Sequence, residues 1–109
     1  MNNMSFEKIS AILESVISKF KVVYLDFSRS EFVPYIRRKI GGVTRLDEST
    51  IYIHSKLSQR EKELTLLHEV LSIYYYTSGI LRHDEEVEEE TKKIYERENL
   101  HLLLQKYVS

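Results

Sequence analysis

His68 and Glu69 are the two residues whose types and spacing point most directly to chemistry. A histidine followed by a glutamate forms the first half of the pattern H-E-x-x-H, in which two histidines one helical turn apart bind one Zn²⁺. The glutamate of that pattern takes a proton from a metal-bound water. In this chain the second histidine position is Ser72, whose neutral hydroxyl binds zinc poorly. The pattern therefore offers a catalytic base at Glu69 and a first metal ligand at His68, but lacks the second histidine ligand.

Further candidate side chains lie near an acidic run at residues 84–90. Glu90 follows Val87 by three residues and precedes Ile94 by four, so a helix would place it on their buried face and leave the other glutamates toward solvent. The histidines that could in principle provide a missing ligand are His54, His83 and His101. Exposed positions at loops or strand ends explain them better. The tyrosine run 74–76 could line a peptide groove, but such a run more often packs one ring inward.

Apolar periodicity and capping residues predict the helices that carry these side chains. The predicted helices cover residues 6–20, 59–77 and 84–103. Ser5 is the expected N-cap of the first helix. Ser58 and Glu61 have the spacing of a capping box and open the helix that contains the His-Glu pair. Asp84 is expected to cap the last, acidic helix.

Three short runs of β-branched and aromatic residues predict strands at 22–27, 43–46 and 50–54. We expect a small antiparallel or mixed sheet, with an antiparallel meander favoured. Residues 50–54 are the expected edge strand, along which an extended substrate could align. Between the first two strands a short helix is compatible with the sequence, although Pro34 would interrupt it.

These segments, in this order, resemble the ImmA/IrrE family of zincin-like metallopeptidases. The resemblance covers about half the chain, residues 40 to 95, and rests on the runs IYIHSKLSQR from Ile51 and LTLLHE from Leu64. Family members place a third metal ligand, a glutamate, in an acidic stretch of the following helix. The resemblance implies a minimal zincin-like α+β domain in which His68 and Glu90 ligate zinc and Glu69 is the general base.

The chain departs from the family pattern at three positions. Ser72 replaces the second histidine, Leu71 stands where a glycine is common, and Lys92 replaces the asparagine that usually follows the glutamate ligand. Two protein ligands remain where a catalytic zinc ion usually has three.

Composition limits the class of protein. A chain of 109 residues is long enough for a single domain, here residues 1–109. It contains no cysteine, which excludes a thiolate zinc site and disulfides. The net charge of −1 argues against general nucleic-acid binding, and the basic run 37–39 fits a solvated surface cluster. The sequence has neither a membrane-spanning stretch nor a signal peptide, so we expect a cytoplasmic protein without a membrane partner.

Three functions remain open on these grounds. The favoured one is a regulatory or partner-binding domain with an incomplete metal site and weak or no peptidase activity. Its partner would be a protein or peptide such as a transcriptional regulator. The alternative is an active zinc endopeptidase that cleaves a regulatory protein, with zinc held by His68, Glu90 and one further donor. The third is an unrelated small α+β regulatory protein in which the His-Glu pair is a coincidence.

Overall fold

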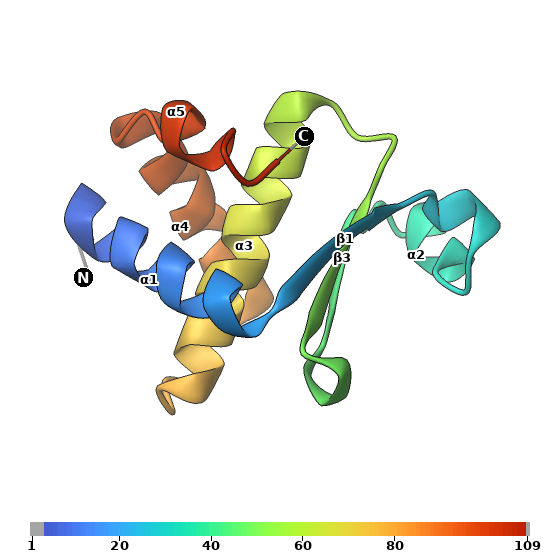
Figure 1. The fold of residues 1–109 in the computed structure, drawn as a ribbon, viewed down its shortest axis with the longest axis horizontal. Coiled ribbons are helices and arrows are strands. Elements are labelled where there is room, and N and C mark those ends of the chain that lie inside the picture. The colour runs from blue at the N-terminus through green and yellow to red at the C-terminus, as the bar shows by residue number, and fades with distance from the viewer. Residues whose placement is uncertain (1–3, 109) are drawn as a thin grey trace.

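The computed structural model describes residues 4–108, and within them the chain forms five α-helices and one three-stranded sheet (Figure 1). In chain order the elements are α1 (Phe6–Lys19), β1 (Lys21–Leu25), α2 (Val33–Arg37), β2 (Gly42–Arg45), β3 (Thr50–His54), α3 (Gln59–Thr77), α4 (Asp84–Arg97) and α5 (His101–Leu104). Two 3-10 helices, η1 (Phe27–Arg29) and η2 (Leu46–Glu48), lie in the connections. The predicted α+β class and the order of the main elements are confirmed.

The sheet is mixed, with the strand order β1-β3-β2. Strand β1 runs parallel to β3 and β2 runs antiparallel to it, so that Ile51 of β3 has Val22 on one side and Thr44 on the other. The mixed sheet is confirmed, but the antiparallel meander and the edge position of residues 50–54 are wrong. The connection through η1 and α2 carries the chain past the place that β3 later fills. The central position buries Ile51 and Ile53 of β3 completely, and the burial of these two apolar side chains stabilises this strand order.

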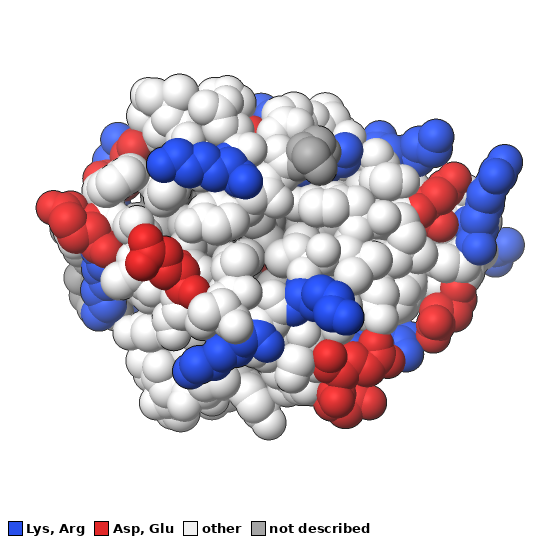
Figure 2. All heavy atoms as spheres, in the orientation of Figure 1, with Lys and Arg blue, Asp and Glu red and all other residues white. Residues whose placement is uncertain are grey.

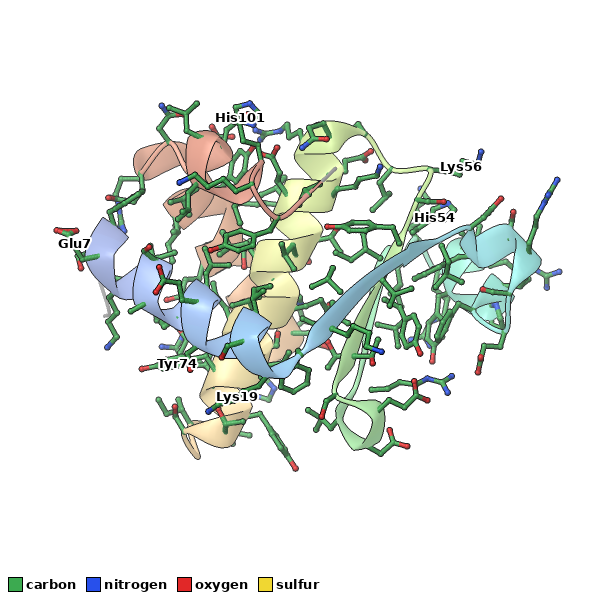
Figure 3. The ribbon with its side chains drawn as sticks, viewed as in Figure 1. Glu7, Lys19, His54, Lys56, Tyr74 and His101 are labelled. Atoms are coloured by element: carbon green, nitrogen blue, oxygen red, sulfur yellow. The ribbon has the colours of Figure 1, made fainter. Side chains whose placement is uncertain are left out.

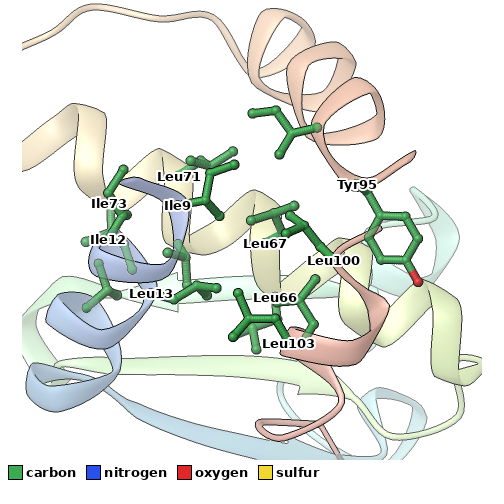
Figure 4. Close-up of a cluster of buried hydrophobic side chains, with 14 of the residues drawn as sticks. Ile9, Ile12, Leu13, Leu66, Leu67, Leu71, Ile73, Tyr95, Leu100 and Leu103 are labelled. Carbon is green, nitrogen blue, oxygen red and sulfur yellow. The ribbon is translucent and has the colours of Figure 1, made fainter. Parts of the chain in front are cut away.

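Helix α3 is the centre of the hydrophobic core. It packs against α1, α4, α5 and the sheet, and these helices lie on one side of the sheet while α2 lies beyond its other side (Figure 1). Figure 4 shows how the apolar side chains of α1 and α3 meet those that follow α4. Fully buried members of this cluster are Ile9, Leu13, Ile51, Ile53, Leu66, Leu67, Val70, Leu71, Leu100 and Leu104. The packing holds α3 firmly against the sheet.

The N-terminal caps follow the sequence closely. Ser5 accepts a hydrogen bond at the start of α1, and Ser58 and Glu61 form the predicted capping box at the start of α3. Each of these caps satisfies backbone N–H groups that have no partner within the helix. In α4 the cap is His83, and Asp84 is the first helical residue, so the capping role predicted for Asp84 is wrong by one position.

Two left-handed residues end the long helices. Gly79 follows α3 with a φ of 73°, and Asn99 follows α4 with a φ of 50°. After Asn99, the N–H of Leu100 donates to the carbonyl of Tyr95 at 3.3 Å, which closes the end of α4. The acidic helix therefore stops at residue 97, and the prediction that it continues to residue 103 is wrong. The chain turns back and α5 buries its leucines against α3.

Helix α2 begins with the proline that was expected to disrupt it. Pro34 lies in the first turn of α2, where a missing backbone N–H removes no helical hydrogen bond. The basic residues 37–39 at the end of this helix are all exposed, in agreement with the solvated cluster predicted there.

Charged side chains of both signs are interspersed over the face shown in Figure 2. Within residues 4–108, no helix combines the length and the apolar content that crossing a lipid bilayer requires.

Candidate functional site

A pocket of about 310 Å³ opens between α3, the β2 region and the loop that joins α3 to α4. Its polar lining residues are Thr44, Glu69, Ser72, Arg82 and Asp84. Its apolar walls include Leu46, Ile73, Tyr76, Ile80, Leu81 and Val87. The structure thus brings the predicted site residues Glu69 and Ser72 together in one concave site. His68 and Glu90 are not among the described residues that line it.

Glu69 is held against strand β2 by one hydrogen bond. The Thr44 hydroxyl donates to Glu69 Oε1 at 2.6 Å, across the contact between β2 and α3. Burial raises the pKa of Glu69 above its ordinary value, and the negative charge of Asp84 adds to this, whereas the bond from Thr44 and the nearby His68 act in the opposite direction. The carboxylate is therefore a poorly solvated group that would gain from a further hydrogen-bond donor or a positive charge.

Gly42 makes the close contact between β2 and α3 possible. A Cβ atom at this position would lie 2.5 Å from Thr65 Cγ2 and 3.2 Å from Glu69 Oε2. A side chain would therefore push the strand away from the helix, and the bond between Thr44 and Glu69 would lengthen. From the sequence alone, the pair Gly41-Gly42 predicts only a turn. Its role in the close approach of β2 to α3 becomes visible only once β2 is paired with β3, and the sequence does not specify that pairing.

Ser72 has a buried hydroxyl without a partner. No described residue makes a hydrogen bond with Ser72 Oγ, although the atom is inaccessible to solvent. Ser72 follows Glu69 by three residues, so both side chains project from the same face of α3 toward the pocket. Leaving a buried hydroxyl unpaired costs on the order of 1–3 kcal/mol. The pocket therefore contains an unmet hydrogen-bonding requirement beside an underpaired carboxylate.

Glu90 faces inward, as its spacing predicts, and only 14% of its side chain is exposed. Its Oε1 accepts a hydrogen bond from the Tyr75 hydroxyl at 2.5 Å and lies 3.9 Å from Arg82 Nη1. The guanidinium of Arg82 also stacks over the ring of Tyr75, 4.6 Å from its centroid. Burial, followed by the bond to Glu90, raises the pKa of Tyr75 and keeps its hydroxyl protonated as the donor. In this arrangement Glu90 joins α3 to α4 through Tyr75 and Arg82.

The side chains as arranged do not fit a catalytic zinc ion. Across residues 4–108, no three side chains of the metal-ligating types His, Asp and Glu are grouped so that they could hold one metal ion together. Ser72 offers a neutral hydroxyl, and Glu90 shares an oxygen with Tyr75. The assignment of zinc to His68 and Glu90 stays a prediction, and no step proposed for this site depends on it.

The remaining histidines have positions that explain them without a ligand role. His54 Nδ1 accepts a hydrogen bond from the Phe27 N–H at 3.1 Å, which ties the end of β3 to η1. His83 is the exposed N-cap of α4. His101 lies in α5, well away from His54, as Figure 3 shows. Its Nδ1 is 2.8 Å from a carboxylate oxygen of Glu63.

Glu63 is a buried carboxylate that the sequence analysis missed. Its side chain is fully buried and accepts hydrogen bonds from the Tyr95 hydroxyl at 2.7 Å and from Gln59 Nε2 at 2.8 Å, in addition to the contact with His101. Burial by itself would raise the pKa of Glu63, but these hydrogen bonds outweigh it and lower the pKa. Glu63 precedes Leu66, Leu67 and Val70 at helical spacing, so the argument that located Glu90 could have located it too.

The tyrosine run confirms the expected packing. Tyr75 is buried, Tyr74 is half-buried and Tyr76 is 69% exposed at the rim of the pocket. The ring of Tyr76 therefore remains available for contacts with a ligand.

Comparison with known proteins adds no relative: no family model, no curated protein and no solved structure matches this chain.

Proposed function

We propose that this protein is a regulatory, partner-binding domain of zincin-like architecture that holds an extended segment of a partner protein at the pocket beside β2. The zincin-like assignment is supported by the sequence resemblance and by the order of the elements around α3. The regulatory character of the partner, for example a transcriptional regulator, is what that resemblance suggests.

The observation that carries the proposal is the free edge of β2 next to the pocket. Strand β2 has β3 as its only strand neighbour among the described residues. The N–H of His54 donates to the carbonyl of Gly41, and because hydrogen-bonded pairs alternate in an antiparallel ladder, the backbone groups of Gly42 and Thr44 point to the open edge. An extended segment can pair with these groups and extend the sheet.

The same strand also directs the segment toward the pocket. The Thr44 side chain faces α3, where it contacts Glu69, and the pocket begins at Thr44 and Leu46. In an added strand, every second side chain would point to this same face of the sheet. Backbone pairing would supply affinity, and the pocket would select one side chain.

Binding is favoured over hydrolysis by the residues themselves. The second histidine position is Ser72, and the carboxylate of Glu90 is engaged by Tyr75 and Arg82. A zinc ion that activates water normally needs three protein ligands. The peptidase alternative lacks that set of ligands, whereas a binding site needs only the edge and the pocket.

Binding at the edge is tested with peptides selected from a random displayed library. Thr44→Pro removes the outward N–H of Thr44, and Thr44→Val is the matched control, because both variants lose the hydroxyl and only the proline loses the N–H. We expect Thr44→Pro to weaken binding by about tenfold or more relative to Thr44→Val, since at least one backbone hydrogen bond is lost. Equal affinities for the two variants, or amide shifts confined to a surface away from β2, would overturn the proposal.

Zinc content tests the architecture and the peptidase alternative together. After dialysis against trace zinc, we expect wild-type protein to retain far less than one zinc per chain. Ser72→His restores the H-E-x-x-H pattern and is expected to gain about one zinc per chain, with Ser72→Ala as the control. No gain in Ser72→His would count against the zincin-like assignment. One zinc per wild-type chain that is lost in His68→Ala would instead favour the endopeptidase.

A further inference from the structure

We infer that the pocket recognises a primary ammonium group, presented as the lysine side chain of a segment bound along β2. This inference rests on the proposed function and specifies the chemistry of the partner. It is drawn from the charges, the unpaired hydroxyl and the apolar walls of the pocket.

The pocket contains two acidic side chains. Glu69 and Asp84 both line it, Glu69 from α3 and Asp84 from the first turn of α4. The one basic lining residue is Arg82, whose guanidinium is engaged by Glu90 and by the ring of Tyr75. Within residues 4–108 neither of the two carboxylates forms an ion pair, although His68 lies near Glu69 and Asp84 is exposed to solvent. A cation between them would relieve their repulsion.

The pocket also contains an unpaired hydroxyl. Ser72 Oγ is buried, lines the same pocket and has no hydrogen-bond partner among the described residues. An ammonium group carries three N–H donors. Its three donors match in number the three acceptor groups that line the pocket, which are the carboxylates of Glu69 and Asp84 and the hydroxyl of Ser72. A neutral apolar side chain would supply no donor to any of the three groups.

The walls of the pocket are largely apolar. Ile73 and Val87 are buried and line the inner pocket, while Tyr76 and Leu81 are 69% and 89% exposed at its mouth. The methylene stem of a lysine packs well on such a surface while its charged end reaches polar groups. The ring of Tyr76 adds a face on which a cation can rest. An arginine would need a planar fork of acceptors, whereas the ammonium needs only convergent oxygens.

The test uses a blocked peptide, acetyl-Thr-Val-Lys-Val-Thr-amide, and variants in which only the central residue changes. Norleucine removes the charge and keeps most of the stem, acetyl-lysine keeps the length and loses the charge, and arginine keeps the charge with a different shape. A fourth peptide has norleucine at the centre and a free N-terminal amine. Affinities are measured from amide shifts of the isotopically labelled protein.

We expect the lysine peptide to bind at least about tenfold more tightly than the norleucine and acetyl-lysine peptides, as the loss of a charge-assisted hydrogen bond requires. Glu69→Gln and Asp84→Asn should each remove most of this preference. Glu85→Gln should leave it unchanged, because Glu85 follows Asp84 in α4 and is exposed like it, but does not line the pocket. Ser72→Ala should weaken lysine binding and leave norleucine binding unchanged. Thermal unfolding confirms that each variant is folded.

The outcomes separate the two proposals. If norleucine binds as tightly as lysine and Thr44→Pro abolishes both, the ammonium inference is overturned and the edge-binding function stands. If the arginine peptide or the peptide with a free amine binds most tightly, lysine is overturned as the recognised group. If none of these peptides binds, the ammonium inference is overturned. The proposed function fails as well if the library-selected peptides bind Thr44→Pro and Thr44→Val equally.

Discussion

Helix α3 carries two inward-facing carboxylates, Glu63 and Glu69, which differ in how many hydrogen-bond donors surround them. Glu63 is surrounded by Tyr95, Gln59 and His101, and despite its burial these hydrogen bonds lower its pKa. Glu69 receives one side-chain hydrogen bond, from Thr44, and burial raises its pKa. A carboxylate with both of its oxygens engaged by buried or half-buried partners holds neighbouring helices together. A carboxylate left short of donors beside a pocket is available to a ligand.

The largest difference is expected when each side chain is truncated. Glu63→Ala leaves the buried Tyr95 hydroxyl without its partner, removes the contacts with the more exposed Gln59 and His101, and empties a fully buried position. We expect it to lower the free energy of unfolding by roughly 3 kcal/mol. Glu69→Ala loses one hydrogen bond and removes an underpaired charge, so we expect a change within about 1 kcal/mol. Urea unfolding of both variants measures the difference. Equal losses would mean that Glu69 is as structural as Glu63.

The pH dependence of stability should also differ in sign. Because its pKa in the folded protein lies below the ordinary glutamate value of about 4.3, Glu63 stabilises the fold above that value and loses this contribution as the pH falls through the folded-state pKa. The stability deficit of Glu63→Gln relative to wild type should therefore shrink in acid.

For Glu69 the folded-state pKa is raised, so the unfolded chain gives up the proton first as the pH rises. The contribution of Glu69 to wild-type stability therefore falls from about pH 4.3 upward, and the stability of Glu69→Gln should rise relative to that of wild type over the same range. Urea midpoints between about pH 3 and pH 7 test both statements. Parallel pH profiles for the two variants would contradict the assigned surroundings.

The smallest expected effect contrasts two serines of α3. Ser58 caps the helix with its hydroxyl, and Ser58→Ala should cost about 1 kcal/mol. Ser72 has an unpaired hydroxyl, so Ser72→Ala should be neutral or should stabilise the free protein by up to about 1 kcal/mol. Thermal unfolding of the two variants measures this contrast. A clear loss of stability in Ser72→Ala would show that its hydroxyl already has a partner in solution.

Local signals in the sequence predicted the helices well. The cap at Ser5, the capping box at Ser58 and Glu61, and the strand Thr50–His54 all depend on residues close to one another in the chain. The break at Asn99 was also a local signal, but the leucines that follow it continued the apolar pattern and concealed it.

The order of the strands could not be predicted in the same way. Whether β3 lies at the edge or in the centre depends on which strands bury Ile51 and Ile53, and that is decided by packing between distant segments. The candidate site was likewise predictable only where it depends on residues close together in the chain. Glu69 and Ser72 were identified from the motif, whereas the contribution of Thr44 required the pairing of β2 beside α3.

Gly42 has a consequence for how this protein can vary. It has no side chain with which to do chemistry, yet any Cβ atom there would meet Thr65 at 2.5 Å. A mutational scan should therefore find position 42 among the least tolerant in the chain, while chemically active neighbours such as Ser72 accept several replacements. In such a protein, intolerance to substitution marks the place where the site is assembled, and the residues that contact a ligand are freer to diversify toward new partners.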